Sequence, residues 1–143
     1  MVDRDLIATK IATIERCLAR IERVRSEPSG RLDSIDVDDI TALNLQRSIQ
    51  AGIDLAAHVV ATEGWGVPAA AGEAFDLLSE HSLLDRDLAS RLRRMAAFRN
   101  IAIHEYRKLD PRIVETVVTN HLGDLRDLVA RVIRAFELER PGI

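Results

Sequence analysis

The hydrophobic residues at the start of the chain repeat with the period of an α-helix. Isoleucines and a leucine alternate at steps of four and three residues, with charged residues between them: Ile7, Ile11, Ile14, Leu18 and Ile21. This narrow, heptad-like seam predicts a helix over residues 3–25. The following Pro28-Ser29-Gly30 breaks the pattern, because proline and glycine disfavour a continuing helix.

Helical spacing of apolar positions recurs through the rest of the chain. A second helix is predicted over residues 36–63, where aspartates favour the N-terminus. A short helix is predicted over 73–79 and a fourth helix over 85–107. A fifth is predicted over 111–139, because an Asp-Pro pair places a cap and a proline at its first positions.

These elements predict an all-α, up-and-down bundle of four long helices and one short helix. A length of 143 residues favours a single domain over residues 1–143. The seam of the first helix and the apolar surface of the fourth leave room for a second copy. Two-fold dimers are the commonest oligomers, so a homodimer is expected.

Composition narrows the setting of the protein. The single cysteine, Cys17, has no internal partner for a disulfide and lies among apolar residues, which favours a core position and a cytosolic protein. No run of 18 apolar residues predicts a membrane span. The first residues lack the basic-then-apolar order of a signal peptide. A cytoplasmic protein without membrane contact is therefore expected.

Charge is unevenly distributed along the chain. The net charge is −3, yet residues 86–108 hold seven basic and two acidic residues, a local charge of +5. The rest of the chain therefore carries −8. This basic stretch is either a solvated helix face or a docking surface for a polyanion.

One stretch inside this basic region carries the candidate chemistry. Arg99, Asn100, His104 and Tyr106 place a guanidinium, an amide, an imidazole and a phenol within eight residues. An imidazole can move a proton near neutral pH, and a guanidinium binds phosphate through two hydrogen bonds. The chain has no H-E-x-x-H, no Glu-x-x-His and no Cys/His cluster with zinc spacing, so neither a metal nor a cofactor is expected.

Helical geometry separates these groups. At about 100° per residue, Arg99 and His104 differ by about 140°, so a straight helix aims them poorly at one phosphate. Either the helix bends or frays, or the same helix of a second subunit completes the site. In the second helix, Gln46, Gln50 and Asp54 share one face, which is either an exposed polar face or brings Asp54 into the site.

The same groups provide the parts needed to cleave RNA. His104 can act as base or acid, and Arg99 can stabilise charge on the phosphoryl oxygens. Asn100 can orient the imidazole or donate to phosphate, and Tyr106 can position the phosphate. Each also has a structural alternative, since a helical histidine or tyrosine often only packs and an arginine often lies on the surface.

The stretch from Arg99 to His104 resembles the R-x4-6-H signature of HEPN ribonucleases, with the expected polar residue after the arginine. The ending His104-Glu105-Tyr106 resembles the H-x-Y of the HepT-like branch. Further segments that look like this family lie at 45–50, 54–59, 64–68, 73–75 and 92–95.

The resemblance implies an all-α homodimer with a composite site at its interface. It implies a metal-independent endoribonuclease toxin in which Arg99 and His104 are catalytic. It also implies control by a minimal nucleotidyltransferase antitoxin that transfers AMP to Tyr106. Two alternatives remain open from the sequence: a non-catalytic module that binds a nucleotidyltransferase or a nucleotide, and a purely structural dimer.

Overall fold

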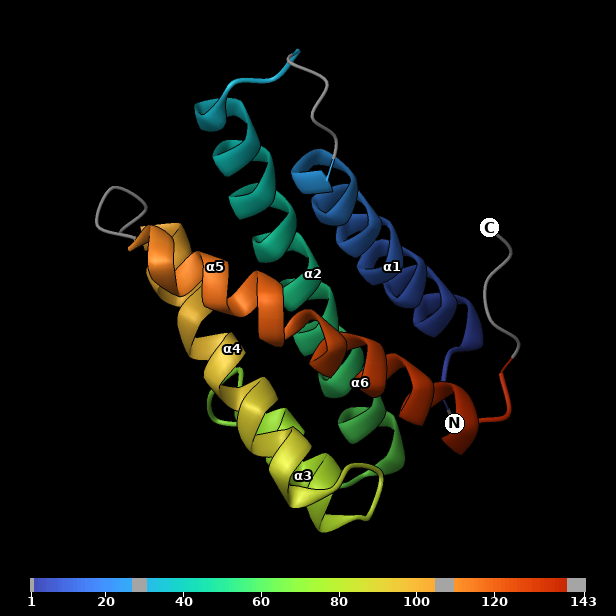
Figure 1. The fold of residues 1–143 in the computed structure, drawn as a ribbon. Helices are drawn as coiled ribbons and strands as arrows, with labels where there is room; N and C mark the ends of the chain where they lie inside the picture. The colour runs from blue at the N-terminus through green and yellow to red at the C-terminus, as the bar shows by residue number, and fades with distance from the viewer. Residues whose placement is uncertain (1, 27–30, 105–109, 139–143) are drawn as a thin grey trace.

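A computed structural model describes residues 2–26, 31–104 and 110–138, without the side chains of 102–104. Within this part of the chain all regular structure is helical, which confirms the predicted all-α class (Figure 1). None of these helices is long and apolar enough to cross a membrane. The helices are α1 (Arg4–Ser26), α2 (Ser34–Glu63), α3 (Glu73–Glu80), α4 (Arg86–His104), α5 (Pro111–Asn120) and α6 (Leu122–Ala135).

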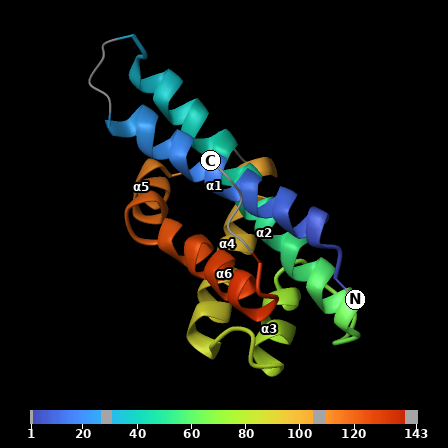
Figure 2. The ribbon, with the colours of Figure 1, turned by 90° about the vertical axis from the view of Figure 1, so that its right-hand side faces the viewer.

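The first two helices form a long antiparallel hairpin (Figures 1 and 2). The seam predicted in α1 is buried throughout, since none of its five residues exposes more than 1% of its surface. The seam therefore packs inside a single chain and is not available to a second copy. The end of the hairpin where α1 stops and α2 starts projects beyond the other helices.

The long helix α2 lies at the centre of the fold and packs against α1, α3, α4 and α6. Its start is fixed by a capping box in which the Asp33 and Asp36 side chains each accept a backbone N–H at the other residue. Its end is fixed by Gly64, whose φ of 71° lies in the left-handed region that glycine adopts without strain. These signals hold the register of α2, and with it the side chains of the candidate site.

Helices α3 and α4 pack against the second half of α2, with Phe75 of α3 in the core. The loop before α3 folds back so that the Trp65 ring stacks on His81, with ring centroids 4.6 Å apart and planes 2° apart. The half-buried Trp65 also packs on the core. Trp65 therefore covers an edge of the core.

The last predicted helix is two helices, so the prediction of one continuous helix over 111–139 is wrong. The chain breaks at His121, whose φ and ψ of −122° and −4° leave the helical region. The buried Asp124 carboxylate lies 3.0 Å from both His121 Nδ1 and Arg91 Nε of α4. This contact fixes the bend, and α6 then crosses the bundle (Figure 1).

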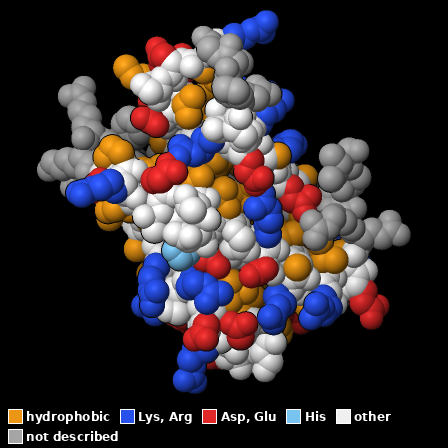
Figure 3. Space-filling view, viewed as in Figure 1, with side chains coloured by type: hydrophobic (Ala, Val, Ile, Leu, Met, Phe, Trp, Pro, Cys, Tyr) orange, Lys and Arg blue, Asp and Glu red, His pale blue; other side chains and the backbone are white. Residues whose placement is uncertain are grey.

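The face that carries α5 and α6 shows no single sign of charge. In Figure 3, basic and acidic side chains alternate across it, with apolar patches between them. Ion pairs also link separate elements, such as Arg131 of α6 with Asp85 just before α4, and Arg126 of α6 with Glu22 of α1. Exposed ion pairs of this kind contribute little stability, about 0–1 kcal/mol each.

Candidate functional site

Helix α4 carries the candidate residues at its C-terminal end. Arg99 is half-buried and Asn100 is exposed, and His104 is the last residue of the helix. The His104 side chain and the whole of Tyr106 lie outside the described residues. Their predicted roles therefore remain predictions.

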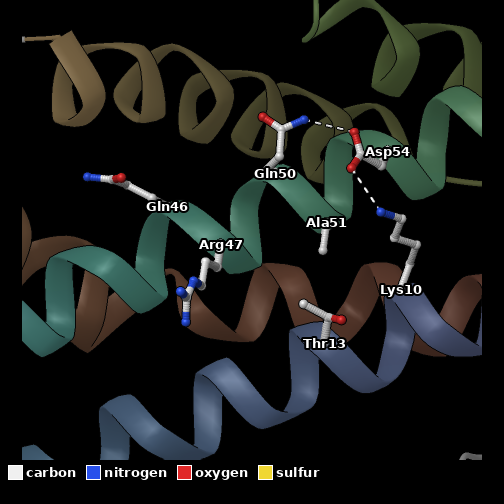
Figure 4. A pocket seen from close by; sticks show the side chains of 7 residues that line it. All are labelled: Lys10, Thr13, Gln46, Arg47, Gln50, Ala51 and Asp54. Atoms are coloured by element: carbon white, nitrogen blue, oxygen red, sulfur yellow. Dashed lines mark hydrogen bonds and ion pairs between the residues drawn. The ribbon is translucent and has the colours of Figure 1, made fainter.

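Polar side chains connect Arg99 to the two neighbouring helices. Arg99 Nη1 donates to Gln50 Oε1 of α2, and Arg99 Nη2 donates to Asn100 Oδ1. Gln50 Nε2 in turn donates to Asp54 Oδ1 at 2.8 Å. Lys10 Nζ of α1 pairs with Asp54 Oδ2 at 3.1 Å (Figure 4). One network therefore joins α4, α2 and α1.

The network brings together Arg99, Asn100 and Asp54, three of the residues that the sequence singled out. Asp54 belongs to it through Gln50 and Lys10, without a bond to Arg99. Gln50 is the residue that sequence reasoning passed over as the partner of Arg99. Its spacing of four residues from Asp54 was visible in the sequence, whereas nothing in the sequence indicated the contribution of Lys10.

The partners of Arg99 decide what its charge can do. Both of its terminal nitrogens bond to neutral amide oxygens, and none bonds to a carboxylate among the described residues. Its Nε is buried and has no hydrogen-bond partner in that part of the chain. Among the described residues the guanidinium is thus held in position without a carboxylate to compensate its positive charge, which suits a group that must attract an anion.

A pocket of about 280 Å³ lies beside this network, between α1 and α2 (Figure 4). Figure 4 shows the Gln50, Asp54 and Lys10 side chains along its edge, joined by two interactions. Its lining consists of Lys10, Thr13, Gln46, Arg47, Gln50, Ala51 and Asp54. Of these seven residues, Gln50 is the one that contacts Arg99, so the pocket and Arg99 lie on either side of this amide.

Helix α4 also has an exposed face that adjoins the site. Positions 93, 97 and 100 are exposed and lie at spacings of three and four residues, and position 104 continues the same row. Arg99 lies on a different side, toward Gln50 of α2. Because α4 stays α-helical up to His104, the helix does not end early to close the angle between Arg99 and His104.

The three histidines with described side chains have structural contacts. His58 Nε2 accepts the backbone N–H of Asp3 at 3.0 Å, which ties the N-terminus to α2. His81 stacks on Trp65, and His121 bonds to Asp124. These contacts account for each of them as a packing or capping residue.

No three histidine, cysteine, aspartate or glutamate side chains gather at metal-binding distance within the described ranges. The cysteine behaves as the sequence predicted, since Cys17 is buried and unpaired. Burial raises the pKa of its thiol, while the positive charges of Arg47 and Arg16 act in the opposite direction. A thiol held neutral in this way is a packing side chain.

Comparison with known proteins places this chain among helical ribonucleases. A family model described as Ribonuclease HepT-like matches residues 14–132. The chain is 38% identical over 125 residues to the mRNA nuclease HepT of Shewanella oneidensis, covering 87% of this chain and 94% of that protein. It is 29% identical over 110 residues to the tRNA nuclease HepT of Aphanizomenon flos-aquae, covering 76% and 75%.

A solved structure gives the same result for the fold. The chain superposes with a TM-score of 0.84 and 36% identity on a tri-AMPylated HEPN toxin of Shewanella oneidensis in complex with MNT antitoxin. The match covers 92% of this chain and 99% of the other. The arrangement of helices that positions Arg99 is therefore shared with that toxin over nearly its full length.

Proposed function

Because this chain belongs to the Ribonuclease HepT-like family and is a ribonuclease, we propose that it is the toxin of a toxin–antitoxin pair and cleaves RNA without a metal. The observation that carries the proposal is the state of Arg99. Its guanidinium is fixed by Gln50 and Asn100, both neutral, so its charge is available to a phosphate. An RNA substrate and the lone thiol of Cys17 fit action in the cytoplasm.

In the proposed reaction, His104 takes the proton of a ribose 2′-OH, and the 2′-oxygen attacks the adjacent phosphorus. The bond from phosphorus to the 5′-oxygen breaks, and that oxygen receives a proton as it leaves. Arg99 stabilises the negative charge that builds on the phosphoryl oxygens, because it already lies in place and needs no reorganisation. The product is a 2′,3′-cyclic phosphate, and Tyr106 helps to position the phosphate.

The active form is proposed to be a homodimer. Arg99 faces α2, whereas position 104 continues the exposed row of α4, so one copy directs the two groups differently. A second copy whose α4 faces the first brings a His104 toward the Arg99 of its partner. The exposed side of α4 next to the network, including Asn100, is the surface expected to meet this second copy.

Control by AMP transfer is proposed for Tyr106. A minimal nucleotidyltransferase antitoxin transfers AMP from ATP to the phenol oxygen, and pyrophosphate leaves. The added phosphate brings negative charge and bulk beside Arg99, where RNA must bind, so both repulsion and exclusion silence the enzyme. The similarity to an AMPylated toxin bound to MNT antitoxin supports this assignment.

Cleavage of a labelled RNA by the purified protein in excess EDTA tests the reaction. We expect cleavage with 2′,3′-cyclic phosphate ends, detected by mass spectrometry, and loss of cleavage in Arg99→Ala and in His104→Ala. Arg86→Gln, an exposed arginine at the other end of α4, is the matched control and should cleave normally. Loss of activity on chelation, or unchanged cleavage by Arg99→Ala, contradicts the proposal.

Incubation with the partner nucleotidyltransferase, ATP and Mg²⁺ tests the control step. Intact-mass measurement should show added AMP on the natural protein and none on Tyr106→Phe, which should keep some cleavage and resist silencing. Modification at another residue, or a modified protein that cleaves at the unmodified rate, refutes the role of Tyr106.

A further inference from the structure

The pocket beside Arg99 continues along the hairpin into a second, larger hollow of about 630 Å³. The two hollows share Thr13 and Arg47, so they form one groove between α1 and α2, here called the α1–α2 groove. On α2 it extends from Asp54 to Ile40. At 1.5 Å per residue this is about 21 Å, which accommodates about six stacked nucleotides at about 3.4 Å each.

The charge of the α1–α2 groove is positive and uncompensated. Arg16, Arg20 and Arg47 line the larger hollow, and none of its described lining residues carries a carboxylate. All three are exposed, and none forms an ion pair within the described part of the chain. In the smaller hollow, Lys10 and Asp54 neutralise each other. The groove therefore carries a net charge of about +3 on a protein whose total charge is −3.

Two arginines of α4 differ from these three, because each of them faces a carboxylate. On α4, Arg93 pairs with Asp76 at 2.6 Å, and Arg91 pairs with the buried Asp124 at 3.0 Å. Keeping three like charges together costs electrostatic free energy, because each repels the others at close range. The cost is offset when a polyanion binds. Figure 4 shows the Arg47 side chain extending from α2 toward α1, where the two hollows meet.

We propose that the α1–α2 groove binds the phosphate backbone of single-stranded RNA beside the cleavage site, with Arg16, Arg20 and Arg47 as the phosphate contacts. The inference rests on the proposed ribonuclease function, which places the scissile phosphate at Arg99. Gln50 lines the groove and also holds Arg99, so a strand leaving Arg99 enters the groove directly. This continuity favours RNA over an acidic protein surface.

The remaining lining indicates weak sequence preference. Leu43 is 46% exposed and lies beside Ile40, which provides an apolar strip for ribose and base edges. None of the described residues that line the two hollows is aromatic, so none of them offers a ring on which a base could stack. Binding in the groove is therefore mainly electrostatic and sensitive to salt.

The test measures binding of a fluorescein-labelled 2′-O-methyl oligonucleotide of about twelve nucleotides, twice the length of the groove, by anisotropy across a salt series. This probe cannot be cleaved, because its 2′-oxygen is blocked. In the triple variant Arg16→Gln, Arg20→Gln and Arg47→Gln, Kd at about 0.1 M NaCl should rise by up to about 100-fold. The slope of log K against log salt should fall by about 2, since each phosphate contact on a single strand contributes about 0.7.

A second triple variant removes the same charge elsewhere. Arg86→Gln, Arg131→Gln and Arg134→Gln lie outside the groove on α4 and α6, and this control should change Kd only slightly. Equal weakening in both variants, no binding by the natural protein, or unchanged Kd and slope in the groove variant overturns the proposal. Loss of self-association or of nucleotidyltransferase binding, with RNA binding intact, assigns the groove to a protein partner and also overturns it.

The cleavage assay separates this inference from the proposed function. If the natural protein cleaves RNA in EDTA and the groove variant keeps the natural KM and salt dependence, the α1–α2 groove does not bind RNA, whereas the proposed ribonuclease function is supported. If the natural protein binds the probe through the groove but cleaves no RNA, the proposed cleavage reaction is refuted, whereas the proposed RNA binding in the α1–α2 groove is supported.

Discussion

Replacing Gln50 with leucine tests how Arg99 is held. Leucine fills nearly the same volume but removes the acceptor for Arg99 Nη1 and the donor to Asp54. A hydrogen bond to a charged group contributes about 1.5–3 kcal/mol. The side chains of Gln50 and Arg99 are both half-buried, so water can replace part of each lost hydrogen bond. We therefore expect a loss of about 1–2 kcal/mol in transition-state stabilisation, which is about 5- to 30-fold in kcat/KM.

The assay compares kcat/KM for RNA cleavage with the free energy of unfolding from urea titration. The free energy of unfolding should change by no more than about 1 kcal/mol, because the bonds lie at a partly hydrated edge. Gln50→Glu is the informative companion. The glutamate still accepts a hydrogen bond from Arg99, but its carboxylate neutralises the positive charge of the guanidinium. We therefore expect kcat/KM to fall further than in the leucine variant.

Two results refute this reasoning. If Gln50→Leu cleaves RNA with natural efficiency and natural stability, Gln50 does not position Arg99. If Gln50→Glu is more active than Gln50→Leu, an uncompensated charge on Arg99 is not what the reaction requires.

Other predictions concern the fold. Ile14→Ala should cost about 2–5 kcal/mol in urea unfolding, because Ile14 is fully buried in the α1 seam; a loss below about 1 kcal/mol contradicts this packing. Asp124→Ala should lower the free energy of unfolding by about 1–3 kcal/mol. This is less than for a fully buried ion pair, because the Arg91 and His121 side chains are over one-third exposed. An unchanged unfolding midpoint argues against a stabilising role of these two contacts. The Arg112 side chain and backbone N–H lower the pKa of Asp110 below its ordinary 3.8. That contribution is present above about pH 4 and lost as pH falls through the lower folded value, so Asp110→Asn should flatten this acid limb in pH-dependent unfolding.

The sequence by itself determined the class of fold and most helix boundaries. The period of apolar residues in α1 and the glycine that follows α2 act locally, so they can be read without knowing what packs where; α2 itself begins at Ser34, two residues before the predicted start. The motif from Arg99 to His104 and the angle between these two residues on a helix could be read from the sequence in the same way. The break at His121 was not, because the Asp124 carboxylate that fixes it is shared with Arg91, 33 residues away.

The tertiary structure decided which polar groups meet. Lys10, Gln50 and Arg99 lie on three different helices, and no spacing within one helix relates them. The structure also decided that the α1 seam packs on α2 within one chain, whereas a seam of that width fits a second copy as well. The uncompensated charge of the α1–α2 groove arises in the same way. Arg16 and Arg47 lie far apart in the sequence, and the hairpin of α1 and α2 brings them to one groove.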